Sequence, residues 1–189
     1  MHSNKYTLIF TSIITISLGF VLSYAATSLK PRQDINVEID MKKNILTALG
    51  IKPQKSEKWS IEEVQEVYEK SINGIVLNTK GEKTEKDPKN IDAEKDKEYF
   101  PIYLHKLNGK TNGYVIPISG KGLWSTIYGY FAIDTDCKTA KGITFYKHGE
   151  TPGLGGEVEK TWFRNNFIGK KFVNQDNMLV GIEVLKGVV

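Results

Sequence analysis

The chain has 189 residues, enough for one domain of ordinary size plus a tail or an anchor. Its net charge is +4, and the 26 basic residues are spread among 22 acidic ones, which argues against a nucleic-acid-binding stripe. The single cysteine, Cys137, excludes an internal disulfide and a cysteine-rich zinc or iron–sulfur site within these residues. The three scattered histidines, His2, His105 and His148, form no metal cluster in the sequence.

The first element is an uncharged run of 24 residues, Tyr6 to Leu29, bounded by Lys5 and Lys30. About 20 apolar residues span a bilayer as a helix, so we expect a tail at 1–5 and a transmembrane helix at 6–29. The alternative is a signal peptide, cleaved within Ser23 to Ala26 to give a secreted protein. The run exceeds the roughly 7 to 15 residues of a signal-peptide core, which favours an anchor. The flanking charges leave its orientation open.

Residues 30–99 are predicted to form a helical linker and a polar excursion. One helix is expected from Asp34, as its N-cap, to Leu49, with Gly50 as the C-terminal cap. A second is indicated by the capping box Ser60-Ile61-Glu62-Glu63 and should end at Asn73-Gly74. Lys80 to Glu98 is almost entirely polar, so we expect a mobile segment there.

Residues 100–189 change to short apolar runs separated by turn residues, which predicts strands. The expected strands are 100–107, 114–119, 123–133, 143–148 and 178–185. Asn108-Gly109 and Asn112-Gly113 point to a hairpin, and Val158 to Ile168 suggests a short helix. The predicted fold class is therefore α+β, with an antiparallel sheet, flanking helices and an N-terminal transmembrane helix.

The stretch His148 to Glu157 is the part least like ordinary scaffold, because four of its ten residues are glycine. Thr151-Pro152-Gly153-Leu154 predicts a type II turn. Gly155 and Gly156 have no β-carbon, which lets main-chain amides approach a flat or charged ligand. The alternative is a connecting loop with nothing bound, since no G-x-G-x-x-G phosphate motif is present.

Three segments together resemble a known family: Gly122-Leu123-Trp124-Ser125, Gly142 to Tyr146, and Glu150 to Val158. They are similar to the C subunit of the sodium-translocating NADH:quinone reductase and to its relative, the G subunit of the Rnf complex. Gly113 to Pro117 and the N-terminal anchor extend the resemblance over almost all of the chain. The polar residues 80–98 are the least similar part.

The resemblance implies an FMN-binding domain on a single-pass helix in the bacterial inner membrane, with the domain in the periplasm. In this family FMN is joined by a phosphoester to a threonine of a Ser-Gly-Ala-Thr motif by a dedicated flavin transferase. Together with the other subunits of the reductase, such a protein relays electrons from NADH towards ubiquinone, coupled to sodium export, and is not active alone. The transmembrane run has no Asp, Glu, Lys, Arg or His side chain to form a sodium path.

From the resemblance we expect Leu123, Trp124, Thr151, Leu154 and Gly155 to border the isoalloxazine ring, with no catalytic acid or base required. Core packing is the alternative for Leu123 and Trp124.

In the family the attachment motif follows the strand expected here at 178–185. These 189 residues contain no Ser-Gly-Ala-Thr, so no attachment threonine is named. If the polypeptide ends at Val189, the alternative is a flavin-free extracytoplasmic binding or assembly module. His148 is expected to face solvent, and Glu150 is left without a role.

Overall fold

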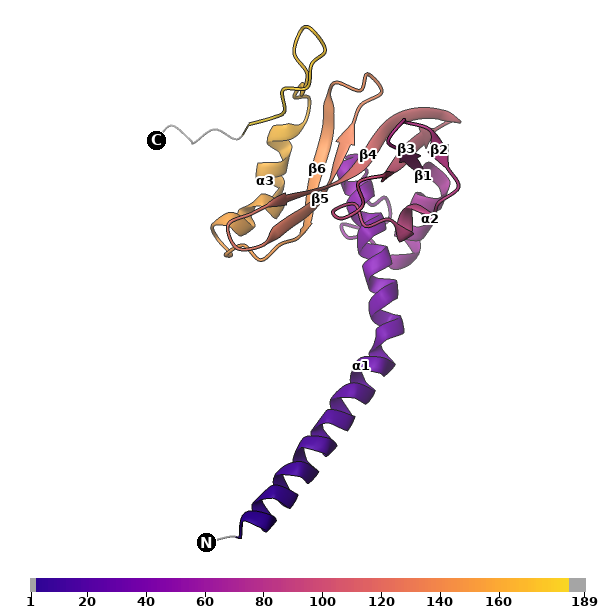
Figure 1. The fold of residues 1–189 in the computed structure, drawn as a ribbon. Helices are drawn as coiled ribbons and strands as arrows, with labels where there is room; N and C mark the ends of the chain where they lie inside the picture. Colours follow the sequence, from indigo (N-terminus) through magenta and orange to yellow (C-terminus); the bar gives the residue numbers. More distant parts are fainter. Residues whose placement is uncertain (1–2, 184–189) are drawn as a thin grey trace. The chain divides into compact units, whose positions relative to one another are not determined.

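The computed structural model describes residues 3–183, and the chain divides into two units, Met1–Asp40 and Met41–Val189. The described part of the first unit is almost wholly the long helix α1 (Asn4–Ala48), which continues into the second unit (Figure 1). Its side chains are exposed from residue 3 to residue 37. By length and composition α1 is able to cross a membrane, in agreement with the span predicted at 6–29.

The predicted separate helix beginning at Asp34 is wrong, because α1 continues through this position without a break. Pro31 lies inside the helix. The Asp34 carboxylate lies 3.5 Å from the Lys30 ammonium, one helical turn earlier. Asp34 therefore forms an i,i+4 ion pair on the surface of a continuing helix instead of capping a new one.

The predicted cap at Gly50 is confirmed. Gly50 has a φ of 76°, and its amide donates to the Thr47 carbonyl at 3.0 Å. The Ile51 amide donates to the Leu46 carbonyl, also at 3.0 Å. These two bonds form a Schellman motif, so backbone amides satisfy two carbonyls of the last turn of α1.

Helix α2 (Ile61–Ser71) begins at the predicted cap, where Ser60 Oγ accepts the Glu63 amide at 3.2 Å. The reciprocal bond of the capping box is replaced, because the Glu63 carboxylate accepts the amides of Gln54 and Lys55. The chain then enters a strand at Ile72 that the sequence analysis missed. The predicted helix end at Asn73-Gly74 is wrong, because both residues pair in the sheet.

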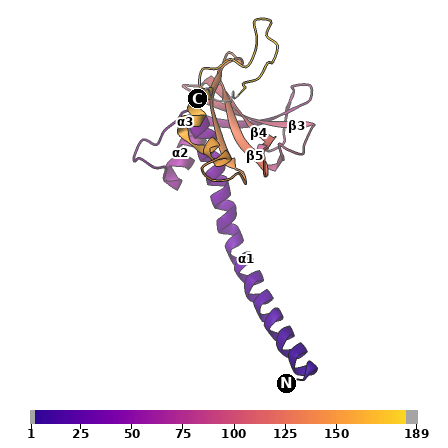
Figure 2. The same cartoon turned by 90° about the vertical axis from the view of Figure 1, so that its left-hand side faces the viewer.

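The antiparallel sheet of the α+β fold is confirmed, and it has six strands in the order β2-β1-β3-β4-β5-β6. The strands are β1 (Ile72–Asn78), β2 (Lys83–Thr84), β3 (Tyr99–Leu107), β4 (Lys110–Lys121), β5 (Thr126–Ile133) and β6 (Ala140–Lys147). Figure 2 shows β3, β4 and β5 side by side in the twisted sheet. The predicted hairpin turn lies at Asn108-Gly109, whose φ angles of 52° and 77° fit a type I′ turn.

Different elements cover the two faces of β6. On one face the end of α1 comes so close that a β-carbon on Gly142 would collide with the Ala48 carbonyl. On the same face the fully buried Thr144 hydroxyl donates to the Asn44 carbonyl at 3.3 Å. On the other face Phe145 contacts Phe163, and α3 (Thr161–Arg164) lies beside β6 (Figure 1). The core therefore has a layer on each side of the sheet.

The polar residues 80–98 were expected to be a mobile excursion, but they hold β2 and the 3-10 turn η1 (Pro88–Asn90). The Glu94 carboxylate accepts the hydroxyls of Thr126 and Tyr128 on β5. Residues 80–98 contact the sheet despite their low hydrophobicity, because side-chain hydrogen bonds and strand pairing stabilise this segment.

The helix predicted at Val158 to Ile168 is split into three pieces: η2 (Gly155–Glu159), α3, and η3 (Asn165–Phe167). The strand predicted at 178–185 is not formed over 178–183, where the ladder is reduced to a bridge between Val173 and Leu179. Residues 184 and 185 lie outside the described part of the chain. The predicted domain limits, 30–99 and 100–189, stay a prediction.

Candidate functional site

Two loops meet at one end of the sheet because their strands are antiparallel neighbours. β4 ends at Lys121 and β5 starts at Thr126, which leaves the loop Gly122–Ser125 between them. β6 ends at Lys147, opposite Tyr128 of β5, so the following loop, His148–Gly156, leaves from the same end. Strand pairing thus brings together two segments that are about 25 residues apart in the sequence.

The carboxylate of Glu150 joins these two loops. It accepts the backbone amides of Leu123, Trp124 and Ser125 at 3.3, 3.0 and 3.3 Å. Glu150 is 8% exposed, and the bond from Trp124 leads the causes that lower the pKa of its carboxyl group. A carboxylate with several backbone donors is held in its charged form. Glu150 therefore fixes the path of the Gly122–Ser125 loop.

Two glycines are required by the packing of Glu150. A β-carbon on Gly122 would collide with the Glu150 carboxylate and would lie 2.8 Å from the Ser125 carbonyl. A β-carbon on Gly155 would lie 3.0 Å from both Cβ and Oε2 of Glu150. Gly155, expected to approach a ligand, thus has a structural reason to be glycine, and its ligand contact stays a prediction.

The predicted type II turn is supported by its geometry. The Leu154 amide donates to the Thr151 carbonyl at 3.1 Å, and Gly153 has the required positive φ, 76°. The Gly156 amide also donates to Thr151, at 3.0 Å. These two amides, like the three bonded to Glu150, already have acceptors within the protein. These five amides are therefore not free to donate to a ligand, and any loop amide that reaches the ligand must be another one.

His148 was expected to face solvent, and this is wrong, because its side chain is only 10% exposed. Its Nδ1 accepts the Glu150 amide at 3.2 Å, and its Nε2 lies 2.8 Å from a Glu159 carboxylate oxygen. The two contacts link the turn to η2, although the Nε2–Glu159 contact is not aligned as a hydrogen bond within residues 3–183. His148 supports the loop on which Glu150 lies. Its strand-end position carried no sequence signal for this role.

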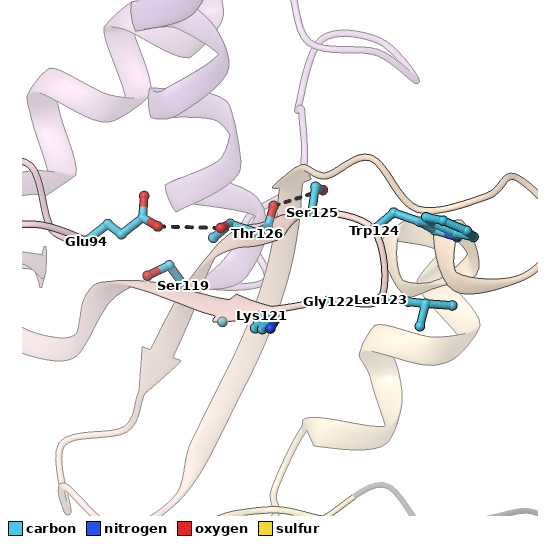
Figure 3. A pocket seen from close by; sticks show the side chains of 9 residues that line it. Glu94, Ser119, Lys121, Gly122, Leu123, Trp124, Ser125 and Thr126 are labelled. Atoms are coloured by element: carbon cyan, nitrogen blue, oxygen red, sulfur yellow. Dashed lines mark hydrogen bonds between the residues drawn. The ribbon is translucent and has the colours of Figure 1, made fainter.

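Beside the Gly122–Ser125 loop lies a cavity of about 380 Å³ (Figure 3). Its lining residues come from Glu94, the end of β4 and the start of β5: Glu94, Ser119, Gly120, Lys121, Gly122, Leu123, Trp124, Ser125 and Thr126. In Figure 3 Glu94 lies at one end, and Leu123 and Trp124 extend from the other. Two of the predicted residues, Leu123 and Trp124, therefore line this cavity, whereas Thr151, Leu154 and Gly155 do not.

The rim of the site is apolar and open. Leu123, Trp124 and Leu154 are 81%, 71% and 73% exposed, so core packing is excluded for the first two. Exposed large apolar side chains on a braced loop give a flat ring surfaces to stack on. The sequence analysis missed Glu150, the group that organises the site. The sequence feature that could have indicated this role is the position of Glu150, an acidic residue at the start of a glycine-rich turn.

Comparisons with known proteins identify this region. The family model of the FMN-binding domain matches residues 122–186, beginning at the Glu150-bonded loop. The C subunit of the Na(+)-translocating NADH-quinone reductase from Haemophilus ducreyi is 35% identical over 94% of this chain and 76% of that protein. Its counterpart from Yersinia pestis is 35% identical over 96% and 76%. The chain belongs to the family of C subunits of this reductase. The resemblance inferred from the sequence is confirmed.

Two solved structures of such C subunits support the same conclusion. The protein from Parabacteroides distasonis has a TM-score of 0.74 and 30% identity, covering 84% of this chain and 77% of that one. The protein from Shewanella oneidensis has a TM-score of 0.66 and 25% identity, covering 79% and 77%. As a member of this family, the chain is part of an NADH-quinone oxidoreductase complex, and the family and domain matches support FMN as its cofactor.

Proposed function

We propose that this protein carries FMN outside the cytoplasm and relays electrons from NADH, received through partner subunits, towards ubiquinone while the complex exports sodium. The observation that supports this most is the Glu150 carboxylate bonded to three amides of the Gly122–Ser125 loop. That bracing holds two exposed apolar side chains beside a cavity in the region matched by the FMN-binding domain.

FMN, when bound, supplies the one- and two-electron chemistry, and the protein supplies position and electrostatics. We propose that Leu123 and Trp124 cover the face of the isoalloxazine ring. Leu154 would cover its edge from the neighbouring turn, with Thr151 and Gly155 closing the polar side. The surfaces fit a planar aromatic group, because they are apolar, exposed and carried by a loop fixed through hydrogen bonds.

The membrane part of the proposal rests on α1, which is long and apolar enough to span a bilayer. We place the flavin-carrying unit on the periplasmic side, as the family resemblance implies. Covalent attachment through a phosphoester threonine is likewise proposed from the family. Other reductase subunits deliver and remove the electrons, so the isolated protein has no turnover of its own.

The test is to express the natural full-length chain with its flavin transferase and compare Trp124→Ala with wild type. The wild-type band should fluoresce in a denaturing gel, which shows covalently held flavin. Trp124→Ala should keep that fluorescence and change stability by less than about 0.5 kcal/mol, because the side chain is exposed. The flavin absorption bands and midpoint potential should shift.

Trp162→Ala is the matched control, since Trp162 is also an exposed tryptophan, 61%, but does not line the cavity. It should leave the flavin spectrum and potential unchanged. Identical flavin properties in Trp124→Ala and wild type would refute the ring contact. A wild-type band without fluorescence would refute covalent attachment and favour a flavin-free extracytoplasmic module.

A further inference from the structure

A second cavity, of about 420 Å³, lies at the β6 edge of the sheet. It is bounded by the end of α1 with the residues just after it, by the start of β6, and by α3 with η3. Its lining residues are Thr47, Ala48, Gly50, Ile51, Lys52, Lys141, Gly142, Ile143, Thr161, Arg164, Asn165 and Ile168. None of them lines the cavity beside Trp124. The two cavities are therefore separate sites.

The charge of this second cavity is one-sided. Lys52, Lys141 and Arg164 line it, and none of its described lining residues is acidic. Two acids lie near these cations without lining the cavity: Asp134 is 3.7 Å from the Lys141 ammonium, and Glu159, which contacts His148, also favours the charged form of Arg164. The Thr161 hydroxyl and the Asn165 amide also belong to residues that line the cavity, whereas the Thr47 hydroxyl already donates to the Lys43 carbonyl at 2.7 Å. Such a lining attracts an anion.

Arg164 lines this cavity with a side chain that is incompletely hydrogen-bonded within residues 3–183. Its Nε is buried, and within residues 3–183 it has no hydrogen-bond partner. Its Nη2 has a long contact of 3.5 Å to Thr161 Oγ1. Burial lowers the pKa of the guanidinium, because desolvation disfavours its charged form, and the negative charge of Glu159 opposes this shift only in part. A guanidinium with an unused donor beside a cavity suits an oxyanion, which accepts several of its N–H groups at once.

The cations are not needed to cap α1, although lysines often complement the carbonyl end of a helix. The Leu46 and Thr47 carbonyls already accept the amides of Ile51 and Gly50. Lys52 is exposed, whereas the Lys141 ammonium donates to the Asn112 carbonyl at 2.6 Å and lies 3.7 Å from Asp134. Lys52 and Arg164 are therefore not required for the cap of α1, whereas Lys141 has partners within the fold.

We propose that this cavity binds the phosphate group of a small organic phosphate, held by Arg164, with Lys52 adding positive charge. A phosphate dianion matches several cations better than a single carboxylate does, and its oxygens accept multiple charge-assisted bonds. Ile51, Ile143 and Ile168 give the remaining wall an apolar character that suits the organic part of the ligand. A soluble phosphate ester and a lipid headgroup share this chemistry.

The experiment is isothermal titration calorimetry of the natural full-length chain in detergent with inorganic phosphate at constant ionic strength. Arg164→Gln should weaken binding roughly tenfold or more, because it removes the charged donor. Lys52→Gln should weaken it by about threefold, because its charge lies in an exposed side chain. Lys52→Gln keeps the test valid if Arg164→Gln does not fold, since Lys52 is exposed.

Lys110→Gln is the matched control, because it removes the same charge from an exposed position outside the cavity. It should bind phosphate as wild type does. No binding by wild type, no loss in Arg164→Gln, or equal loss in Lys110→Gln would overturn the proposal. A short-chain phosphatidic acid that binds more tightly than inorganic phosphate supports a lipid headgroup, and equal binding supports a soluble ester. Flavin fluorescence reports separately on the proposed redox function.

Discussion

Two charged residues, Glu150 and Arg164, show opposite ways of placing an ionic group in this fold. The pKa of each is below its ordinary value, but the meaning differs. The pKa of the Glu150 carboxyl is lowered chiefly by the Trp124 amide, which means that its charged form is stabilised. For Arg164 the lowering, caused by burial, means that the charged form is destabilised. One group is satisfied by the protein, and the other has an unused donor.

This contrast separates a scaffold from a candidate ligand site. Glu150 accepts three backbone amides, so the loop it holds is fixed before any cofactor arrives. Such bracing lowers the ordering cost of binding a rigid ring. Arg164 has a buried Nε without a partner among residues 3–183, and it borders a cavity. The comparison predicts large stability losses at the first region and small ones at the second.

The largest expected effect is that of Glu150→Ala. It leaves the amides of Leu123, Trp124 and Ser125 without their acceptor, so the unfolding midpoint should fall by about 10 °C. Thermal unfolding followed by tryptophan fluorescence measures it. The control is Glu85→Ala, an exposed acid whose removal should change the midpoint by less than about 2 °C.

The way in which stability depends on pH gives a second test of the role of Glu150. Because the folded-state pKa of Glu150 is depressed, its contribution is present above the unfolded-state pKa and disappears as the pH falls through the folded-state value. The acid limb of the stability curve should therefore be flatter in Glu150→Ala than in wild type. Parallel acid limbs in the two proteins would contradict the assignment of this carboxylate as the brace.

The next effect is that of Gly122→Ala, which adds a β-carbon in collision with the Glu150 carboxylate. We expect a loss of roughly 1–3 kcal/mol in unfolding free energy, because the loop must shift. Gly120→Ala is a close control, since a β-carbon there meets nothing within 4 Å. Denaturant titration of both variants measures the difference. Equal losses would show that the contact with Glu150 is not the cause.

The smallest expected effect is that of Arg164→Met, which keeps an unbranched side chain as far as the position of Nε and removes the charge of a half-buried residue. Unfolding free energy should change by less than about 1 kcal/mol or increase, because a half-buried cation with an unpaired Nε adds little stability. Chemical denaturation without phosphate measures it. A loss larger than that of Gly122→Ala would show that Arg164 supports the fold and would erase the contrast with Glu150.

Local signals predicted several elements correctly because their cause lies within a few residues. The Gly50 cap, the Ser60 N-cap, the Asn108-Gly109 turn and the Thr151–Leu154 turn all depend on short-range backbone geometry. The apolar run at 6–29 likewise reported a helix able to span a membrane. Strand β1 escaped detection because Asn73-Gly74 resembles a helix stop, while its pairing partner β3 is distant in sequence.

By itself, the sequence determined the family, the α+β class and the two loops near which FMN is proposed to bind, because these depend on composition, periodicity and short motifs. Only the tertiary structure decided what Glu150, Glu94 and Arg164 do. The partners of Glu150 and Glu94 lie 25 to 34 residues away in sequence, and strand pairing brings them together. The unused donor of Arg164 is visible only once every neighbour is in place. Long-range satisfaction of polar groups is a property of the folded chain and has no local sequence pattern.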